Sequence, residues 1–239
     1  MSESMSKKLF LGALSSAAFM STSIISTSVE AVTLDYRHEY KHHTEQHANR
    51  VKVSDSMGIF YYGLEAKFAG QSEDDGTQGA FSDLGRGDSE IDWGIKYPLD
   101  ENWYIQPGMP ITFGDGNNSL KPQFRIGYRA SSLPLTTTLR YRRQYTSYSD
   151  DDREDYVQNK ITFVMSYSPG DYRYWLELNY NHNEDRDIFD NGREAYDAIF
   201  GAGRRFGSWM PYFDLSDVGV SSDSDTRQLR TRVGLKYYY

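Results

Sequence analysis

RQLRTRVGLKYYY, residues 227–239, decides the fold, because large apolar or aromatic side chains alternate in it with charged and polar ones. Successive side chains of an extended strand point to opposite faces. One face therefore carries Leu229, Val233, Leu235, Tyr237 and Tyr239, and the other carries Gln228, Arg230, Arg232, Lys236 and Tyr238. The pattern predicts a β-strand with one face toward an apolar medium and one toward water.

The same alternation recurs along the chain, whereas sustained helical spacing of apolar residues does not. Twelve alternating segments are predicted as strands: 32–41, 50–55, 59–69, 89–97, 103–113, 119–130, 135–146, 156–167, 172–181, 194–205, 209–216 and 227–239. Long polar connections (42–49, 70–88, 114–118, 147–155, 182–193, 217–226) take turns with short ones (56–58, 98–102, 131–134, 168–171, 206–208). Transmembrane barrels show this asymmetry, because their periplasmic turns are tight and their extracellular loops extend.

The fold class predicted is therefore all-β: a 12-stranded antiparallel transmembrane β-barrel with short periplasmic turns and long extracellular loops. Both chain ends would lie in the periplasm. A soluble barrel is the alternative, with apolar side chains inside and charges outside, and alternation alone does not separate the two. Twelve tilted strands would enclose a backbone cylinder of about 24 Å, leaving a lumen of roughly 10 to 12 Å after side chains are added.

The N-terminal segment predicts export. Residues 1–31 combine the bases Lys7 and Lys8 with a short apolar run and end in Val29-Glu30-Ala31, which is typical of a cleaved signal peptide. The domain organisation predicted is thus a signal peptide, 1–31, followed by a channel-forming barrel, 32–239. A membrane anchor is the alternative, but serines at 21–28 interrupt the apolar run before it reaches the ~20 residues that a spanning helix needs.

Composition excludes several functions. Of the 239 residues 38% are hydrophobic but 15% are aromatic, which argues against disorder. The net charge of −8 gives no general attraction for nucleic acid, so no nucleic-acid partner is expected. The chain has no Cys, which excludes disulfides, thiolate metal sites and Cys nucleophiles.

The location predicted is the bacterial outer membrane. The export signal, the loop asymmetry and the terminal alternation Tyr237-x-Tyr239 all favour it, the last because it resembles the C-terminal recognition signal of outer-membrane proteins. The partners expected are accordingly the barrel-assembly machinery, outer-membrane lipid and lipopolysaccharide.

The lumen is predicted to be positively charged although the whole chain is negative. Alternation places sixteen bases inward, against seven acids: Asp35, Glu39, Glu65, Asp92, Glu177, Asp197 and Asp214. Most bases fall on two tracks that should face each other across a closed barrel. One track holds Lys121, Arg125, Arg129, Arg140, Arg142 and Lys160, and the other holds Arg230, Arg232, Lys236, Arg37, Arg50, Lys52 and Lys67; the remaining inward bases are Lys41, Lys96 and Arg173.

Arg125 is expected beside Arg140 across a hairpin, and like charges so placed cost stability. A chain that keeps this unfavourable pairing suggests that an anion passes through the lumen. Arginine suits the task because its planar fork binds a carboxylate bidentately and stays charged. The alternative is that these bases pair with Glu39, Glu65 or Glu177 and only fill the lumen. Inward Tyr61, Tyr104, Tyr212, Tyr238 and Trp175 could stack on sugars, although wall packing is the simpler interpretation.

Several short segments resemble the KdgM family of oligogalacturonate-specific monomeric porins, which also includes the sialic-acid channel NanC. They are Val32-Thr-Leu-Asp-Tyr-Arg-His-Glu39, Ile105-Gln-Pro-Gly108, Leu139-Arg-Tyr-Arg142, Trp209-Met-Pro-Tyr-Phe-Asp214 and Thr231-Arg-Val-Gly-Leu-Lys-Tyr237. The resemblance implies a monomeric outer-membrane channel for passive diffusion of acidic oligosaccharides, and the opening DYRHE favours oligogalacturonate. The connection at 70–88 has no counterpart in the resemblance.

Other functions remain as alternatives: a sialic-acid or other sugar-acid channel, an outer-membrane barrel enzyme of lipase or protease type, or a structural barrel. An enzyme would need Ser, His and a polar orienting group at one height, or paired Asp and His at the mouth. Four of the five His fall within 38–47, where a solvated loop is a simpler interpretation than a metal site, and the acidic loops do not match a calcium-binding pattern. We expect no enzymatic activity, no cofactor and no metal.

Overall fold

A computed structural model describes residues 30–70, 79–81, 84–150 and 152–239, so almost all of the predicted signal peptide, 1–31, and most of the connection 70–88 lie outside the described residues. The described chain is built from strands: β1 Glu30–Lys41, β2 Gln46–Met57, β3 Phe60–Gly70, β4 Leu84–Ile95, β5 Tyr97–Pro98, β6 Trp103–Gly108, β7 Ile111–Phe113, β8 Asn117–Leu120, β9 Gln123–Arg129, β10 Leu135–Tyr148, β11 Tyr156–Tyr167, β12 Tyr172–Asn183, β13 Glu194–Arg204, β14 Trp209–Gly219 and β15 Arg227–Tyr238.

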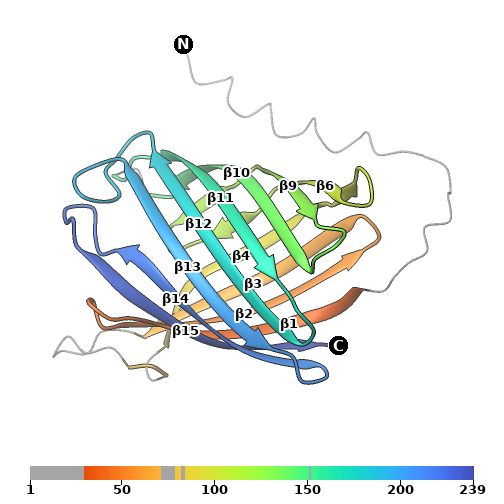
Figure 1. Ribbon diagram of the computed structural model, residues 1–239. Coiled ribbons are helices and arrows are strands. Elements are labelled where there is room, and N and C mark those ends of the chain that lie inside the picture. Colours follow the sequence, from red (N-terminus) through yellow and green to blue (C-terminus); the bar gives the residue numbers. More distant parts are fainter. Residues whose placement is uncertain (1–29, 71–78, 82–83, 151) are drawn as a thin grey trace, which may run out of the picture.

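These strands form one closed antiparallel barrel (Figure 1). The first and last strands close it, because β1 pairs with β15 from Thr33↔Tyr238 to Lys41↔Arg230. The fifteen strands correspond to the twelve predicted segments, since β4 with β5, β6 with β7, and β8 with β9 are pieces of three interrupted strands. The predicted fold class is confirmed, as a closed ring has no edge that would leave backbone groups unpaired in a bilayer.

Proline explains two of the three interruptions. Pro110 separates β6 from β7, and Pro122 separates β8 from β9. A proline has no N–H to give to the ladder, so it confines regular pairing to the pieces on either side. The backbone adapts locally, because Lys121 N donates to Pro110 O at 2.9 Å and Arg143 N donates to Pro122 O at 3.0 Å. The wall therefore stays joined across both gaps.

The strands are longer at one end than the sequence predicts. β2 begins at Gln46 rather than at residue 50, and β4 begins at Leu84 rather than at 89, so the connection predicted at 42–49 shrinks to 42–45. β10, β12 and β14 also extend by two or three residues into the predicted loops. Both faces of a strand are polar where it rises above the bilayer, so apolar alternation ends before backbone pairing does.

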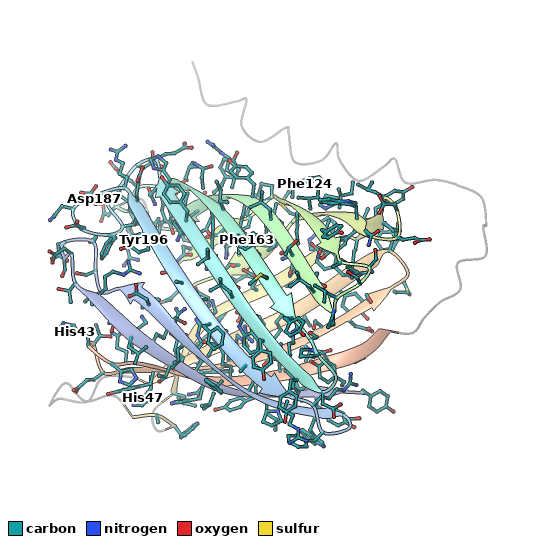
Figure 2. All side chains as sticks on the ribbon, viewed as in Figure 1. His43, His47, Phe124, Phe163, Asp187 and Tyr196 are labelled. Atoms are coloured by element: carbon teal, nitrogen blue, oxygen red, sulfur yellow. The ribbon has the colours of Figure 1, made fainter. Side chains whose placement is uncertain are left out.

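Burial in the barrel is inverted relative to a soluble protein. Among the described residues fifteen polar or charged side chains are buried, against five hydrophobic ones. Large apolar residues such as Leu64, Phe124 and Phe200 are instead about half exposed on the outer surface, and Figure 2 labels Phe124 and Phe163 on the barrel wall. In β14 exposure alternates residue by residue. The soluble-barrel alternative is thereby excluded, because its apolar residues would lie inside.

Aromatic pairs mark the end of the barrel with the short turns. Trp103 lies 4.8 Å from Tyr128, and Trp209 lies 4.6 Å from Tyr237, between ring centroids. Outward Trp and Tyr at this height are typical of the membrane–water interface, where a ring meets lipid and its polar atom meets water. The C-terminus lies at this end, opposite Asp187 and His43 (Figures 1 and 2). No helix within the described ranges is long and apolar enough to cross a membrane.

The orientation of the barrel can be tested with single cysteines, since the chain has none of its own. Ser149 is exposed in the connection after β10, and Ser132 is exposed in the short turn before it. We expect a membrane-impermeant thiol reagent to label Ser149→Cys on intact cells and to reach Ser132→Cys only after the outer membrane is opened. The reverse result would overturn the topology.

Candidate functional site

The inward bases form two walls of the lumen. The first, here called the arginine wall, comes from β9, β10 and β11 together with Lys121 between β8 and β9; the second, here called the paired wall, comes from β15, β1, β2 and β3. Strand order places β10 opposite the β15–β1 seam in the closed ring. A lumenal cavity of about 490 Å³ brings the two sides together, because Lys160 lines it with Arg37, Arg50, Lys52, Arg230, Arg232 and Lys236.

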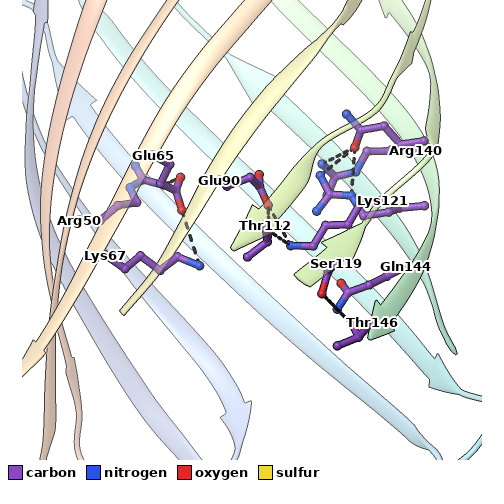
Figure 3. Close-up of polar contacts among 12 residues, drawn as sticks. Arg50, Glu65, Lys67, Glu90, Thr112, Ser119, Lys121, Arg140, Gln144 and Thr146 are labelled. Atoms are coloured by element: carbon purple, nitrogen blue, oxygen red, sulfur yellow. Dashed lines mark hydrogen bonds and ion pairs between the residues drawn. The ribbon is translucent and has the colours of Figure 1, made fainter. Parts of the chain in front are cut away.

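Acids neutralise much of the paired wall. Arg232 Nε donates to Glu39 Oε2 at 2.7 Å, and Arg230 Nε lies 3.8 Å from the same oxygen. Arg232 also lies 3.8 Å from an oxygen of Asp214. Arg50 contacts Asp35 at 2.5 Å and Glu65 at 3.4 Å, and Glu65 also lies 3.6 Å from the amine of Lys67, as Figure 3 shows. On this side the alternative interpretation, that lumenal bases pair with lumenal acids, describes the geometry.

In the arginine wall, neutral groups instead hold Arg125, Arg140 and Arg142. Arg142 donates to Gln123 Oε1 from Nε at 3.0 Å and from Nη2 at 2.7 Å, and Arg140 Nη1 reaches the same oxygen at 3.5 Å. Arg140 Nη2 also donates to the Thr162 hydroxyl at 3.0 Å, and Arg125 donates to Gln106 at 3.1 Å. Within the described part of the chain, no carboxylate forms an ion pair with Arg125, Arg140 or Arg142. Their charge is therefore not neutralised by contact.

Like charges meet directly across the strands of the arginine wall. Arg125 and Arg140 are register partners, as predicted, and Arg142 is the partner of Lys160. Such pairs cost about 0.2 to 1 kcal/mol each relative to neutral ones. Close neutral acceptors position these guanidinium groups without cancelling their charge, so an anion in the lumen can still be attracted to them.

Two residues that contact this wall, Glu90 on β4 and Gln123 on β9, were not predicted from the sequence. Glu90 was not counted among the inward acids, yet it accepts from Lys121 Nζ at 2.8 Å and from Thr112 at 2.8 Å (Figure 3). Its position two residues before inward Asp92 was the available signal. Gln123 was not assigned a role from the sequence, because residue spacing alone does not show that one amide oxygen holds two arginines.

Inward aromatic rings lie against the wall rather than across the lumen. Tyr104, Trp175 and Tyr212 are the register partners of Gly127, Gly201 and Gly234. A Cβ added at Gly127 would lie 2.1 Å from the Tyr104 ring, and one at Gly201 would lie 2.0 Å from Trp175. Each ring thus occupies the space that a side chain on the neighbouring strand would fill. This supports wall packing as the role of these aromatics.

Several of the predicted bases lie toward the short-turn end. A cavity of about 500 Å³ there is lined by Lys52, Lys96, Arg125 and Arg129. The cationic groups of Arg129 and Lys96 each lie 5.2 Å from the Tyr104 ring centroid. At this distance a cation is attracted to the ring face. Lys236 lies 5.3 Å from the Tyr212 ring. Bases therefore continue along the lumen from β10 to this opening.

Comparison with known proteins identifies the family. A family model described as "Oligogalacturonate-specific porin protein (KdgM)" matches residues 25–239. The chain belongs to the KdgM family. Its curated relatives include the protein YiiY of Salmonella typhimurium, 28% identical over 92% of this chain and 96% of the relative, and the oligogalacturonate-specific porin KdgM of Dickeya dadantii, 28% identical over 91% and 95%. The N-acetylneuraminic acid channel NanC of Escherichia coli is 25% identical over 72% of this chain and 73% of NanC.

Solved structures agree on the fold. A KdgM porin in complex with disordered oligogalacturonate superposes with a TM-score of 0.66 and 23% identity, covering 87% of this chain and 99% of the porin. An outer-membrane channel from Pseudomonas putida F1 gives the same TM-score at 12% identity, covering 93% and 100%. The protein is therefore an outer-membrane β-barrel of the KdgM family, as the sequence predicts, and its characterised relatives are porins.

Proposed function

We propose that this KdgM-family barrel lets acidic oligosaccharides, oligogalacturonate first among them, diffuse passively across the outer membrane without a cofactor. The observation that carries the proposal is the arginine wall, where Arg125, Arg140 and Arg142 face the lumen without a carboxylate partner among the described residues. The family and the oligogalacturonate porin of Dickeya dadantii support the choice of substrate class.

The chemistry of transport follows from the spacing of the bases. A guanidinium binds a carboxylate through two parallel hydrogen bonds and keeps its charge at every relevant pH. Arg140 and Arg142 lie two residues apart on one strand, which is about 6.6 Å along the strand direction. A polyanion can therefore exchange one guanidinium for the next, provided that each contact is weak enough to release. In this proposal the predicted basic sites on both walls bind substrate in turn: Arg125, Arg129, Arg140, Arg142, Lys160, Arg37, Arg50, Lys52, Arg230, Arg232 and Lys236.

Uptake by cells tests the proposal. A strain that lacks its general porins and the KdgM-type channel, but can degrade oligogalacturonate, should regain growth on oligogalacturonate when it expresses this protein. The physical reason is that an anion accumulates in a lumen with an excess of bases. Growth rate at limiting substrate is the measurement.

Neutral maltooligosaccharides of similar length provide the control. They fit the same lumen but gain nothing from its charge, so they should enter more slowly than oligogalacturonate. Equal rates would show that acidic selectivity is wrong. N-acetylneuraminate belongs in the same experiment, because one relative of this chain is an N-acetylneuraminic acid channel.

The remaining expectations extend the same proposal. A channel rather than a lipase or protease is supported by the porin relatives and by a lumen lined with bases. A closed barrel whose outer surface is apolar would be inserted by the barrel-assembly machinery and would contact lipid and lipopolysaccharide directly. The proposal also includes a monomeric state, in which each barrel encloses its own channel.

A further inference from the structure

A second cluster of aromatic and basic side chains lies at the end of the barrel opposite the termini. Tyr148 ends β10 and Tyr156 begins β11, and Arg153 lies in the connection between them, while Arg186 follows β12. These four side chains line a cavity of about 450 Å³ together with Glu154, Asp155 and Asp185. None of the four was assigned a role above.

The two tyrosines lie on the lumenal side of their strands. Thr146 is almost fully buried inside the barrel and bonds to Ser119 at 2.7 Å. Tyr156 is the register partner of Thr146, and Tyr148 lies two residues further along β10 on the same face. The cluster therefore borders the extracellular mouth of the channel rather than the lipid-facing surface.

Both arginines lie against tyrosine rings. The Arg186 guanidinium carbon is 3.7 Å from the Tyr156 ring centroid, and Arg186 Nη1 reaches the Tyr148 hydroxyl at 3.5 Å. Arg153 lies 5.5 Å from the Tyr148 ring. A stacked guanidinium is held in place through its flat face, while N–H groups on its edge can still donate to an anion.

Three acids line the same cavity, and two of them, Asp155 and Asp185, are held by backbone N–H groups. Asp155 accepts from the backbone N of Tyr148 at 2.9 Å, and Asp185 accepts from the backbone N of Val157 at 2.6 Å. Glu184 pairs at 2.8 Å with Arg143, which projects from the opposite face of β10. In the described ranges neither Arg153 nor Arg186 forms an ion pair. Both guanidinium groups thus keep N–H groups that can donate to an anion at the mouth, beside the acids Glu154, Asp155 and Asp185.

The cluster is in line with the arginine wall. Tyr148 shares β10 with Arg142, six residues away, and Tyr156 shares β11 with Lys160. At about 3.3 Å per residue, the mouth cluster lies about 20 Å above Arg142 along the strand. A saccharide held at the mouth would have its next carboxylate-binding groups directly below it, on the same side of the channel.

We propose that Tyr148, Arg153, Tyr156 and Arg186 form a capture site, in which the arginines bind a carboxylate of an arriving acidic oligosaccharide and the tyrosines support its ring. This inference rests on the proposed function, and adds to it a binding step that precedes the lumen and exists only on the extracellular side. Capture raises the rate at which substrate enters but leaves the selectivity of the lumen unchanged.

Single-channel recording with trigalacturonate tests the capture site. The channel is placed in a phospholipid bilayer without lipopolysaccharide, so that the added trimer is the only acidic saccharide present. Streptavidin bound to biotinylated Ser222→Cys, in the connection between β14 and β15, keeps the extracellular end on the side of addition. The frequency of current interruptions is measured with trigalacturonate on each side in turn.

In the double variant Arg153→Gln/Arg186→Gln, the interruption frequency should fall about tenfold at low salt when trigalacturonate is added to the extracellular side, since electrostatic steering changes capture rates by ten- to a thousandfold. The frequency for periplasmic addition should not change. Arg143→Gln is the control, because it removes a positive charge on the same strand, β10, that is already paired with Glu184. Its interruption frequency should stay close to that of the wild type.

Three outcomes would overturn the capture site. The first is an unchanged interruption frequency in the double variant when trigalacturonate is added to the extracellular side. The second is an equal fall in frequency for addition to either side, which would indicate a general effect of charge on the channel. The third is an equal fall in interruption frequency in the double variant and in Arg143→Gln. If the wild type shows no more interruptions with trigalacturonate than with neutral maltotriose from either side, the proposed function itself fails and the capture site fails with it.

Discussion

Replacing Arg140 and Arg142 together by glutamine should sharply reduce the anion preference of the channel. Glutamine retains hydrogen-bonding groups but removes two charges that no ion pair neutralises within the described residues. Two unit charges about 5 Å from a passing anion in water contribute about 1.7 kcal/mol, which is somewhat more than tenfold in local anion concentration. The reversal potential under a salt gradient should therefore move toward zero.

Salt dependence separates this electrostatic effect from a change in pore shape. Charges are screened over about 30 Å at 0.01 M salt and about 3 Å at 1 M, so the loss should be large at low salt and small at high salt. Arg143→Gln is again the control, since Arg143 lies on the same strand but faces outward and is paired. An unchanged reversal potential in a correctly folded double variant would show that Arg140 and Arg142 only fill the lumen.

Replacing Glu39 by glutamine should have the opposite effect and increase anion preference. Glu39 is the acid that Arg230 and Arg232 share, and its side chain and theirs are largely buried in the paired wall. Removing its charge leaves two guanidinium groups facing the lumen, with Arg232 retaining only the longer contact to Asp214. Stability should fall by about 1 to 3 kcal/mol, the usual cost of losing a hydrogen bond to a charged group.

The measurements are the reversal potential at low salt and the temperature at which the barrel unfolds in detergent. Glu194→Gln is a suitable control, because Glu194 is exposed at the start of β13 and lies 4.0 Å from His182, and within the described residues it forms no ion pair with an arginine. If Glu39→Gln left ion preference unaltered, Arg230 and Arg232 would take no part in the electric field of the pore, and selectivity would reside in the arginine wall alone.

The sequence predicted most of the architecture because the bilayer acts on every strand in the same way. Lipid on one side and water on the other impose the alternation seen in β14 and β15, so strand number and facing could be derived locally. The register of Arg125 with Arg140 was also predictable, since a short turn joins β9 to β10. The strand ends above the bilayer were not predictable, because no apolar face marks where a strand ends there.

Alternation did not predict that arginines of the paired wall contact acids while Arg125, Arg140 and Arg142 of the arginine wall do not. Glu39 neutralises Arg232 because the two are register partners where β15 meets β1, strands that lie at opposite ends of the sequence. That register is set by closure of the whole ring. Likewise Gln123 holds Arg142 because of side-chain lengths and angles across a strand pair, which residue spacing does not encode.

Because glycines lie beneath the inward rings, the width of the lumen and its charge can change independently. Tyr104, Trp175 and Tyr212 lie flat only because Gly127, Gly201 and Gly234 have no side chain. The width of the lumen thus depends in part on positions that carry no charge, whereas its electrostatic preference depends on the basic positions. A lineage that acquires a bulkier or slimmer sugar acid as its nutrient can therefore resize the passage through its glycines while its arginines keep their arrangement.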